Sequence, residues 1–232
     1  MKRTFLFLLT AALIAFGLQS CNKEDNNGGD GGDATTLQWV DLGLPSGLLW
    51  ADRNVGADKP EDYGNYYAWG ETAPKEAYNW STYAHGNDGY ALTKYCSQSN
   101  YGLDGFTDNL TTLEASDDAA TVNLGDGART PTEVEWQELL DNTSGSWTTR
   151  NEVYGCLLTA SNGKSLFLPA AGDRYDTILR SAGEDGYYWS STMVWEYPNS
   201  GRASRFILEG QMTPGYGRFV GFTVRAVRAN QN

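Results

Sequence analysis

Gly186-Tyr-Tyr-Trp-Ser-Ser-Thr192 and Gly221-Phe-Thr-Val-Arg-Ala-Val-Arg228 are the two stretches of this 232-residue chain that decide its fold. Both have the aromatic and β-branched content typical of buried sheet. Between them, residues 193–220 are rich in Trp, Tyr, Arg, Asn, Gln and Gly, with one convincing strand at 203–208. Two strand-like anchors around an irregular, aromatic and polar segment are typical of a scaffold that presents a binding surface.

The N-terminus has the pattern of an exported lipoprotein. Lys2 and Arg3 precede an apolar run, residues 5–18, that is too short to span a bilayer comfortably. A basic start, a short apolar run and small residues at the cleavage point are typical of a secretory signal. Leu18-Gln-Ser-Cys21 resembles the bacterial lipobox. We therefore predict a lipoprotein signal peptide over residues 1–20 and lipidation of Cys21, the alternative being an ordinary signal peptide with an incidental Cys.

Residues 21–36 are predicted to be a flexible tether behind the lipidated cysteine. They consist mostly of Asn, Gly, Asp and Thr, and such a segment buries too little apolar surface to offset its ordering entropy. Lys23-Glu-Asp25 resembles the acidic surface-export signal of Bacteroidetes lipoproteins, although the start of a solvated linker fits equally well. The expected location is the outer membrane, lipid-anchored, at the cell surface.

Residues 37–229 have the length of one domain, which is enough to form a hydrophobic core without the support of disulfides or metal ions. The formal net charge is −12, with 17 basic and 29 acidic residues. Removal of Lys2 and Arg3 with the signal leaves 15 basic residues and a net charge of −14. Because so acidic a chain repels nucleic acid and anionic membrane surfaces, we expect no nucleic-acid partner, and membrane contact through the lipid anchor only.

The sequence of the domain predicts short strands and long loops. Residues 39–50 predict two short strands joined by a Pro-Ser-Gly turn, and residues 66–70 and 164–168 predict two more. Residues 71–112 show little periodicity, which predicts an extended loop region pinned by Tyr and Trp. Long loops inside a compact domain are often functional.

Two helices are expected in the middle of the chain. Thr132 and Glu135 form a capping box, and the apolar residues of 136–140 fall at i, i+3 and i+4, so a helix runs from Thr132 to Asn142. A shorter helix is predicted at residues 117–122, with two Asp in its first turn, where the macrodipole favours acids.

A resemblance to a known family rests on several spaced motifs. Arg129-Thr-Pro-Thr-Glu-Val-Glu-Trp136 resembles a signature of formylglycine-generating-enzyme-like domains. The Fibrobacter succinogenes major paralogous domain of Bacteroidetes lipoproteins is a closer match over residues 39–228. The motifs that carry it are Val40-Asp-Leu-Gly-Leu-Pro-Ser-Gly-Leu-Leu-Trp50, Tyr63-Gly-Asn-Tyr-Tyr-Ala-Trp-Gly-Glu71, Ser116-Asp-Asp-Ala-Ala120, Phe167-Leu-Pro-Ala-Ala-Gly172 and Gly186-Tyr-Tyr-Trp-Ser-Ser-Thr192.

This resemblance implies a C-type-lectin-like fold of the α+β class. Such a fold has two helices, a twisted antiparallel sheet and long loops on one side. The elements expected from the residues alone, two helices and then strands between long loops, agree with that class.

The cysteines bear on catalysis and on cross-linking. The oxidising enzymes that the chain resembles use cysteines near the C-terminal motif, and no Cys follows Cys156 here; we therefore expect no enzyme of that kind. Cys96 and Cys156 are a candidate disulfide in an exported protein, and two separate buried thiols fit as well.

Other chemistry has weak support in the sequence. His85, the single histidine, is expected on a surface loop. Asp117, Asp118 and Asp126 are weak candidates for calcium ligands, since Ca²⁺ needs several oxygens, and no other cofactor is expected. The insertion of Tyr197 in Glu196-Tyr-Pro-Asn199 breaks a sugar-binding lectin motif.

The expected function is non-catalytic binding of an unidentified protein or glycan. In similar proteins diversified by retroelements, scattered positions of this C-terminal stretch vary on a constant framework. The analogous positions here are Met193, Val194, Trp195, Tyr197, Arg202, Gln211, Thr213, Tyr216, Arg218 and Val220. The alternatives are a carbohydrate-active enzyme or accessory protein that uses acidic pairs such as Glu184 and Asp185, and a structural adhesion or envelope component.

Overall fold

The computed structural model describes residues 36–207 and 210–231, which form an α+β unit. The predicted signal peptide, Cys21 and nearly all of the predicted tether lie outside the described residues. Within the described part, no helix is both long enough and apolar enough to cross a bilayer.

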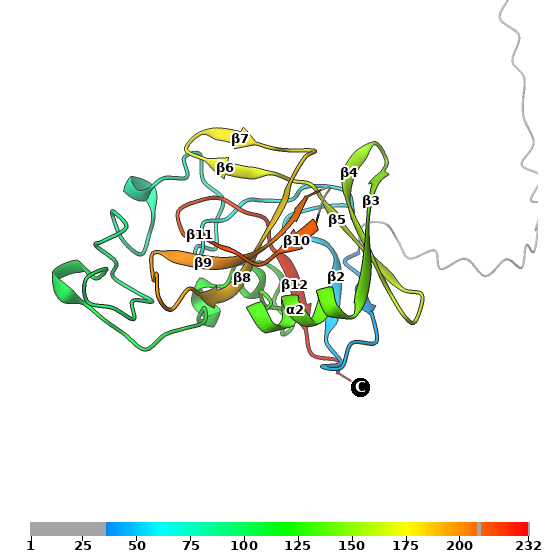
Figure 1. Ribbon diagram of the computed structural model, residues 1–232, viewed down its shortest axis with the longest axis horizontal. Helices are drawn as coiled ribbons and strands as arrows, with labels where there is room; N and C mark the ends of the chain where they lie inside the picture. Colours follow the sequence, from blue (N-terminus) through cyan, green and yellow to red (C-terminus); the bar gives the residue numbers. More distant parts are fainter. Residues whose placement is uncertain (1–35, 208–209, 232) are drawn as a thin grey trace, which may run out of the picture. The chain divides into compact units, whose positions relative to one another are not determined.

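The two ends of the domain meet in one small antiparallel sheet. β1 (Trp39–Asp41) pairs with β2 (Leu49–Asn54), as the turn-linked strands of the sequence predict, and β12 (Arg225–Arg228) pairs with the other edge of β2. Trp50 lies opposite both Val40 and Val227. The closing stretch is therefore part of the framework, as expected (Figure 1).

The segment between the two anchor stretches forms a second sheet. β8 (Gly186–Met193) pairs with β9 (Ser200–Ile207), whose other edge pairs with β10 (Gly210–Met212) and β11 (Gly215–Gly217). The sequence predicts only one strand between residues 193 and 220, and the structure adds the two short ones. β10 and β11 share one edge of β9, so the segment runs as a folded ribbon (Figure 1).

Two further groups of strands complete the architecture. β3 (Thr143–Arg150), β4 (Val153–Ala160) and β5 (Ser165–Pro169) form a meander, and β6 (Asp173–Tyr175) pairs with β7 (Ile178–Arg180). β5 confirms the strand expected at 164–168. β3 and β6–β7 carry many polar side chains and show no clear alternation, so the sequence does not reveal them.

Both expected helices are present, although the first begins two residues later than predicted, so that Asp117 and Asp118 precede it and do not lie in its first turn. α1 (Ala119–Leu124) begins after Asp118, whose side chain accepts the amides of Ala120 and Thr121. α2 (Glu133–Asp141) begins after Thr132 with the predicted capping box. Three one-turn 3₁₀ helices, at Trp80–Thr82, Leu103–Gly105 and Ala115–Asp117, interrupt the long loops. The rest of residues 71–112 has no strand, in agreement with the loop prediction.

Aromatic side chains bury the interior. Trp136 of α2 packs edge-on against Trp50, with ring centroids 4.8 Å apart, and also contacts Phe206 of β9. Trp189 of β8 packs against Phe222, with centroids 4.3 Å apart. Such pairs add directional contacts to the apolar area that they bury. The first group joins α2 to β2 and β9, and the second joins β8 to the segment just before β12.

Two expectations are corrected here. Residues 66–70 are not a strand: Tyr67 makes an isolated bridge with Phe222, and the amide of Trp69 donates to the carbonyl of Arg218. Cys96 and Cys156 are both buried but form no disulfide, because they lie in different core clusters of the described chain. The alternative of two separate buried thiols is the one that the structure supports.

Candidate functional site

The predicted binding segment divides into buried and exposed positions. Four of its side chains lie in the interior and do not reach a surface ligand: Met193, Val194, Arg218 and Val220. Their prediction as ligand contacts is wrong. The physical reason is that residues 193–207 and 210–220 fold back onto the preceding loop region. The three apolar side chains and the Arg218 guanidinium are therefore buried between this segment and the loops.

Arg218 shows how the ribbon holds the long loop. Its guanidinium donates to the backbone carbonyls of Lys94 and Tyr95 and lies 4.6 Å from the ring centroid of Trp69. Burial lowers the pKa of Arg218, with opposing contributions from Tyr83 and nearby groups. Arg218 therefore anchors residues 94–95 to the framework and supports the surface above it.

The turn between β8 and β9 carries two exposed aromatic side chains. Trp195 is 51 % exposed and Tyr197 is 60 % exposed. Ser97 Oγ donates to the Trp195 carbonyl at 2.7 Å, and Gln98 Nε2 donates to the Glu196 carbonyl at 2.8 Å. Since the backbone of the turn is held by these bonds, both rings are displayed from a fixed base.

A second loop brings further aromatic side chains beside this turn. Tyr90, also largely exposed, stacks on Tyr101 with centroids 5.2 Å apart. Gly89 lies so close to Asn199 that a Cβ at this glycine would come within 3.1 Å of the Asn199 side-chain nitrogen. The two loops, residues 86–101 and 194–199, therefore adjoin, and we call them together the aromatic loop surface.

The remaining predicted positions lie on the second sheet. Arg202 is half-buried and forms an ion pair with Glu133 at the start of α2, at 3.4 Å. Thr213 and Tyr216 are also partly exposed. Gln211 belongs to β10, which pairs with β9 opposite Phe206, and its side chain lies outside the described part of the chain. Arg202 and Tyr216 lie near the start of β9, close to the aromatic turn, because Tyr216 pairs with Gly201, whereas Gln211 pairs near the far end of β9.

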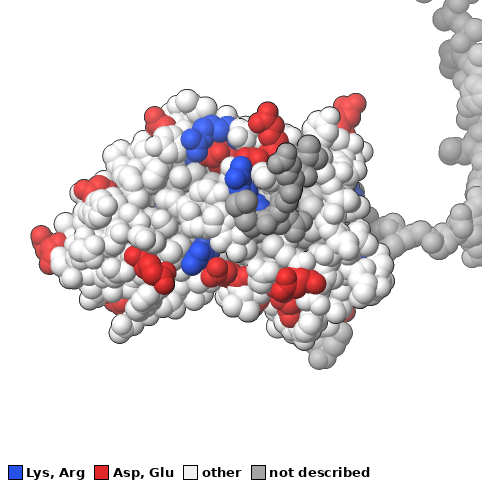
Figure 2. Space-filling view, viewed as in Figure 1, with Lys and Arg blue, Asp and Glu red and all other residues white. Residues whose placement is uncertain are grey.

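Beside Tyr216, the structure assembles a polar group that the sequence does not reveal. Asp185 accepts the Tyr187 hydroxyl at 2.8 Å and Arg205 Nη2 at 3.0 Å, and Asp173 accepts Arg180 Nε at 3.0 Å. Figure 2 shows acidic and basic side chains close together on this face of the molecule. In the sequence, Asp185 is a candidate only as a member of the acidic pair Glu184–Asp185. No sequence motif predicts that it lies near Asp173 and Arg180.

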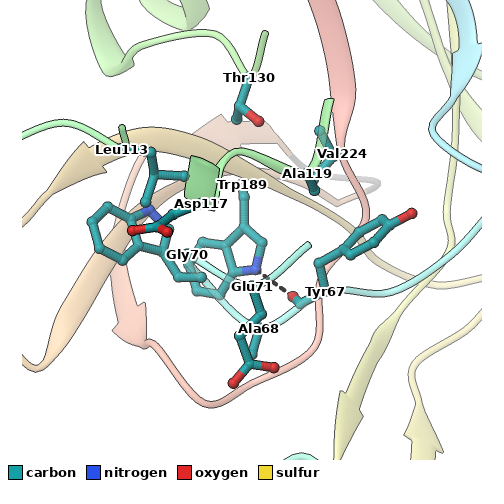
Figure 3. A pocket seen from close by; sticks show the side chains of 11 residues that line it. Tyr67, Ala68, Gly70, Glu71, Leu113, Asp117, Ala119, Thr130, Trp189 and Val224 are labelled. Atoms are coloured by element: carbon teal, nitrogen blue, oxygen red, sulfur yellow. Dashed lines mark hydrogen bonds between the residues drawn. The ribbon is translucent and has the colours of Figure 1, made fainter. Parts of the chain in front are cut away.

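A narrow pocket lies beneath the loops and is lined by Trp189, Leu113, Gly70, Glu71 and Asp117, among others (Figure 3). Trp189 Nε1 donates to the Tyr67 carbonyl at its side, at 2.7 Å. Asp117 already has strong partners, because it accepts Lys94 Nζ at 2.7 Å and the Tyr95 hydroxyl at 2.6 Å. One wall of the pocket is therefore the Asp117 carboxylate, whose hydrogen bonds to Lys94 and Tyr95 are already made.

His85 also lies next to Asp117, which corrects its assignment to a surface loop. Its side chain is only 16 % exposed, and Nε2 lies 2.8 Å from the Gly70 carbonyl and 3.8 Å from Asp117 Oδ2. The ring also packs edge-on between Tyr83 and Tyr95. His85 thus fills space under the loop and supports its backbone.

The three candidate calcium ligands have three different roles. Asp117 pairs with Lys94, the buried Asp118 caps α1 and accepts the Thr130 amide and hydroxyl, and Asp126 lies in an exposed turn at positive φ. Among residues 36–207 and 210–231, no three His, Cys, Asp or Glu side chains are grouped so as to hold a metal ion. The described geometry gives the calcium prediction no support.

Comparisons with known proteins return no match for this chain: no family model, no curated protein and no solved structure.

Proposed function

We propose that this protein is a surface lipoprotein whose domain binds a protein or glycan ligand without catalysis and without a metal cofactor. Lipidation at Cys21 would tether the domain to the outer membrane through residues 21–36. The observation that carries the binding proposal is the display of Trp195 and Tyr197 on a turn whose backbone is hydrogen-bonded to the neighbouring loop.

Physical reasons favour a contact role for these rings. An exposed Trp or Tyr ring contributes nothing to the core, whereas its large rigid area binds a partner at low conformational cost. Tyr and Trp dominate the energetics of many interfaces. Tyr90 and Tyr101 extend the same surface on the adjoining loop. Grouped exposed aromatic side chains are typical of interaction sites.

We further propose that the domain has a C-type-lectin-like fold. The features that support this proposal are two helices, the pairing of the last strand with the N-terminal strands, and long loops beside a C-terminal antiparallel sheet. In such an arrangement the framework strands carry the stability and the loops carry the contacts. Sequence variation at Trp195 and Tyr197 among sister copies would test whether the surface is diversified.

The experiment is binding of the full-length protein to arrays of glycans and of envelope or host proteins. The Trp195→Ala, Tyr197→Ala double variant is expected to lower the affinity for the bound ligand by about 10-fold or more, the effect of losing a typical interface hot spot. Tyr154→Ala is the matched control, because Tyr154 is a comparably exposed aromatic residue, 52 % exposed, on the β3–β4 hairpin. Equal binding by the wild type, the double variant and the control would refute the proposed surface.

A further inference from the structure

Two ion pairs lie outside the aromatic loop surface, one on the β6–β7 hairpin and one at the second sheet. Asp173 and Arg180 face each other across the β6–β7 hairpin. Asp185 and Arg205 form the second pair, and Arg205 is the strand partner of Tyr187. The two pairs are linked through the backbone, since the amide of Gly172, next to Asp173, donates to the carbonyl of Asp185 at 2.7 Å.

Each carboxylate uses only one of its oxygens. Oδ2 of Asp185 accepts both Tyr187 and Arg205, and Oδ2 of Asp173 accepts both nitrogens that Arg180 presents. Among the described contacts, Oδ1 of either residue has no partner, and neither Oδ1 is among the fully buried unpartnered atoms. Both second oxygens are therefore open acceptors whose position is fixed by the ion pair behind them.

Tyr216 of β11 lies beside Tyr187, the residue whose hydroxyl Asp185 accepts. Its ring packs edge-on against Tyr187, with centroids 5.4 Å apart, and against Phe222 at 5.1 Å. Burial raises the pKa of the Tyr216 hydroxyl, Arg205 opposes the rise, and Asp185 and Asp173 add to it. The ring of Tyr216 adjoins the second pair through Tyr187, whose hydroxyl Asp185 accepts, and the backbone bond from Gly172 to Asp185 brings the first pair into the same group.

The group offers a particular pattern of donors and acceptors. Carboxylates accept only, guanidinium groups donate only, and a tyrosine hydroxyl does both. The side chains of Asp173 and Asp185 are 6 % and 15 % exposed, whereas those of Arg180 and Arg205 are 47 % and 28 % exposed. The acceptors are thus less exposed than the donors, and the Tyr216 ring lies beside the second pair through its contact with Tyr187.

We propose that Asp173, Arg180, Asp185, Arg205 and Tyr216 form a calcium-independent binding site for a neutral carbohydrate. Vicinal sugar hydroxyls donate to a carboxylate oxygen and accept from a guanidinium at the same time, and the apolar face of a sugar ring packs on an aromatic side chain. The proposal rests on the proposed binding function and names its ligand class, but it uses a different part of the surface.

The charges favour a neutral ligand over an anionic one. The two arginines of the group are balanced by its two aspartates, so the group carries no net charge. An anionic sugar would place its charge near two recessed carboxylates in a protein of net charge −12. A neutral polyol avoids this repulsion and still satisfies both Oδ1 atoms.

The test uses full-length protein in detergent, an array of neutral and acidic oligosaccharides, and buffer with EDTA. We expect binding of a neutral oligosaccharide in EDTA, and isothermal titration with that sugar should give the affinity of each variant. Asp185→Asn should weaken binding about 10-fold or more, because a hydrogen bond to a charged acceptor is lost. Tyr216→Phe removes only the hydroxyl and should weaken binding several-fold.

Glu184→Gln is the matched control, because it neutralises the exposed acid next to Asp185; it should leave the affinity unchanged. Thermal melting shows whether each variant is folded, and Tyr216→Phe decides the outcome if Asp185→Asn does not fold. The proposal is overturned if no neutral oligosaccharide binds, if EDTA abolishes binding, or if Asp185→Asn and Tyr216→Phe bind like the wild type. A protein ligand sensitive to Trp195 and Tyr197, with no sugar bound, would overturn this inference and leave the binding function standing.

Discussion

At the scale of single residues, the buried Arg225 connects three strands of the framework. Arg225 is fully buried and donates to Asn54 Oδ1 at 2.9 Å, to the Ala51 carbonyl at 3.1 Å and to the Phe167 carbonyl at 3.0 Å. Burial lowers the pKa of Arg225 to about 10, so the group stays charged at neutral pH. The Arg225 side chain thus connects β12 to β2 and β5 through uncharged acceptors. The sequence alone shows only that an arginine lies within a strand.

Replacing Arg225 should therefore be costly. Arg225→Leu leaves three acceptors without their donor in the interior, and we expect it to lower the free energy of unfolding by about 3–5 kcal/mol. Arg150→Leu is the control, because Arg150 is half-exposed and pairs with Glu61 at 3.4 Å; its cost should be about 1 kcal/mol or less. Urea unfolding followed by tryptophan fluorescence measures both, and equal costs would contradict the assigned role of Arg225.

At the scale of elements, α2 is the part best determined by local sequence. Thr132 Oγ1 accepts the Glu135 amide, and Glu135 Oε2 accepts the Thr132 amide at 2.8 Å. Arg129 adds two charged hydrogen bonds to the same carboxylate. The apolar face then packs Trp136 and Leu139 inward. Capping and periodicity agree here, so the sequence predicts both the helix and its first residue.

The Glu135 carboxylate makes the stability of α2 depend on pH. Burial alone would raise the pKa of Glu135, but the hydrogen bonds from Arg129 and from the Thr132 amide outweigh it and lower the pKa. A lowered pKa in the folded state stabilises the fold above the unfolded pKa, and this stabilisation is lost as the pH falls through the folded value. Acid should therefore weaken the cap of α2.

Glu135→Gln should remove that dependence. We expect the variant to be about 1–2 kcal/mol less stable at pH 7, and its stability should fall less steeply than that of the wild type between about pH 5 and pH 3. Glu184→Gln, which neutralises an exposed carboxylate, should keep the wild-type slope. Chemical unfolding at several pH values measures the slopes, and parallel curves for Glu135→Gln and the wild type would refute the linkage.

Other elements escape sequence analysis for identifiable reasons. β3 reads Thr-Ser-Gly-Ser-Trp-Thr-Thr-Arg and exposes much of its length, so its pairing with β4, not hydrophobic alternation, defines it. Residues 66–70 have strand composition but bury their side chains against Phe222 and Arg218 without forming a ladder. In both places, long-range contacts override local propensity.

At the scale of the whole described unit, Phe222 connects segments that are distant in the sequence. Phe222 stacks on Tyr187 with centroids 4.8 Å apart, contacts Trp189 and Tyr216, and bridges to the backbone of Tyr67. Phe222 thus contacts the N-terminal half of the domain through its backbone, and β8 and β11 through its ring. The sheet face and the loop region therefore depend on the same packing.

Phe222→Ala should consequently destabilise the domain as one unit. We expect a loss of about 3–5 kcal/mol, the usual cost of removing a buried Phe ring, with far-UV circular dichroism and tryptophan fluorescence still reporting one transition. Val134→Ala, at an exposed position of α2, should change the stability by about 0.5 kcal/mol or less. Two separate transitions in the wild type or in Phe222→Ala would show that loops and sheet unfold independently.

The sequence by itself determined the α+β class, the presence of both helices, the cap of α2, and the framework strands at both ends, because these follow from local capping, periodicity and composition. It also marked Trp195, Tyr197 and Tyr216 as candidates for contact. Only the tertiary structure decided that Met193, Val194, Arg218 and Val220 turn inward, and that the backbone beside Asp173 pairs with Asp185. The reason is that burial and the meeting of side chains depend on how distant segments pack, and no periodicity within a segment records that packing.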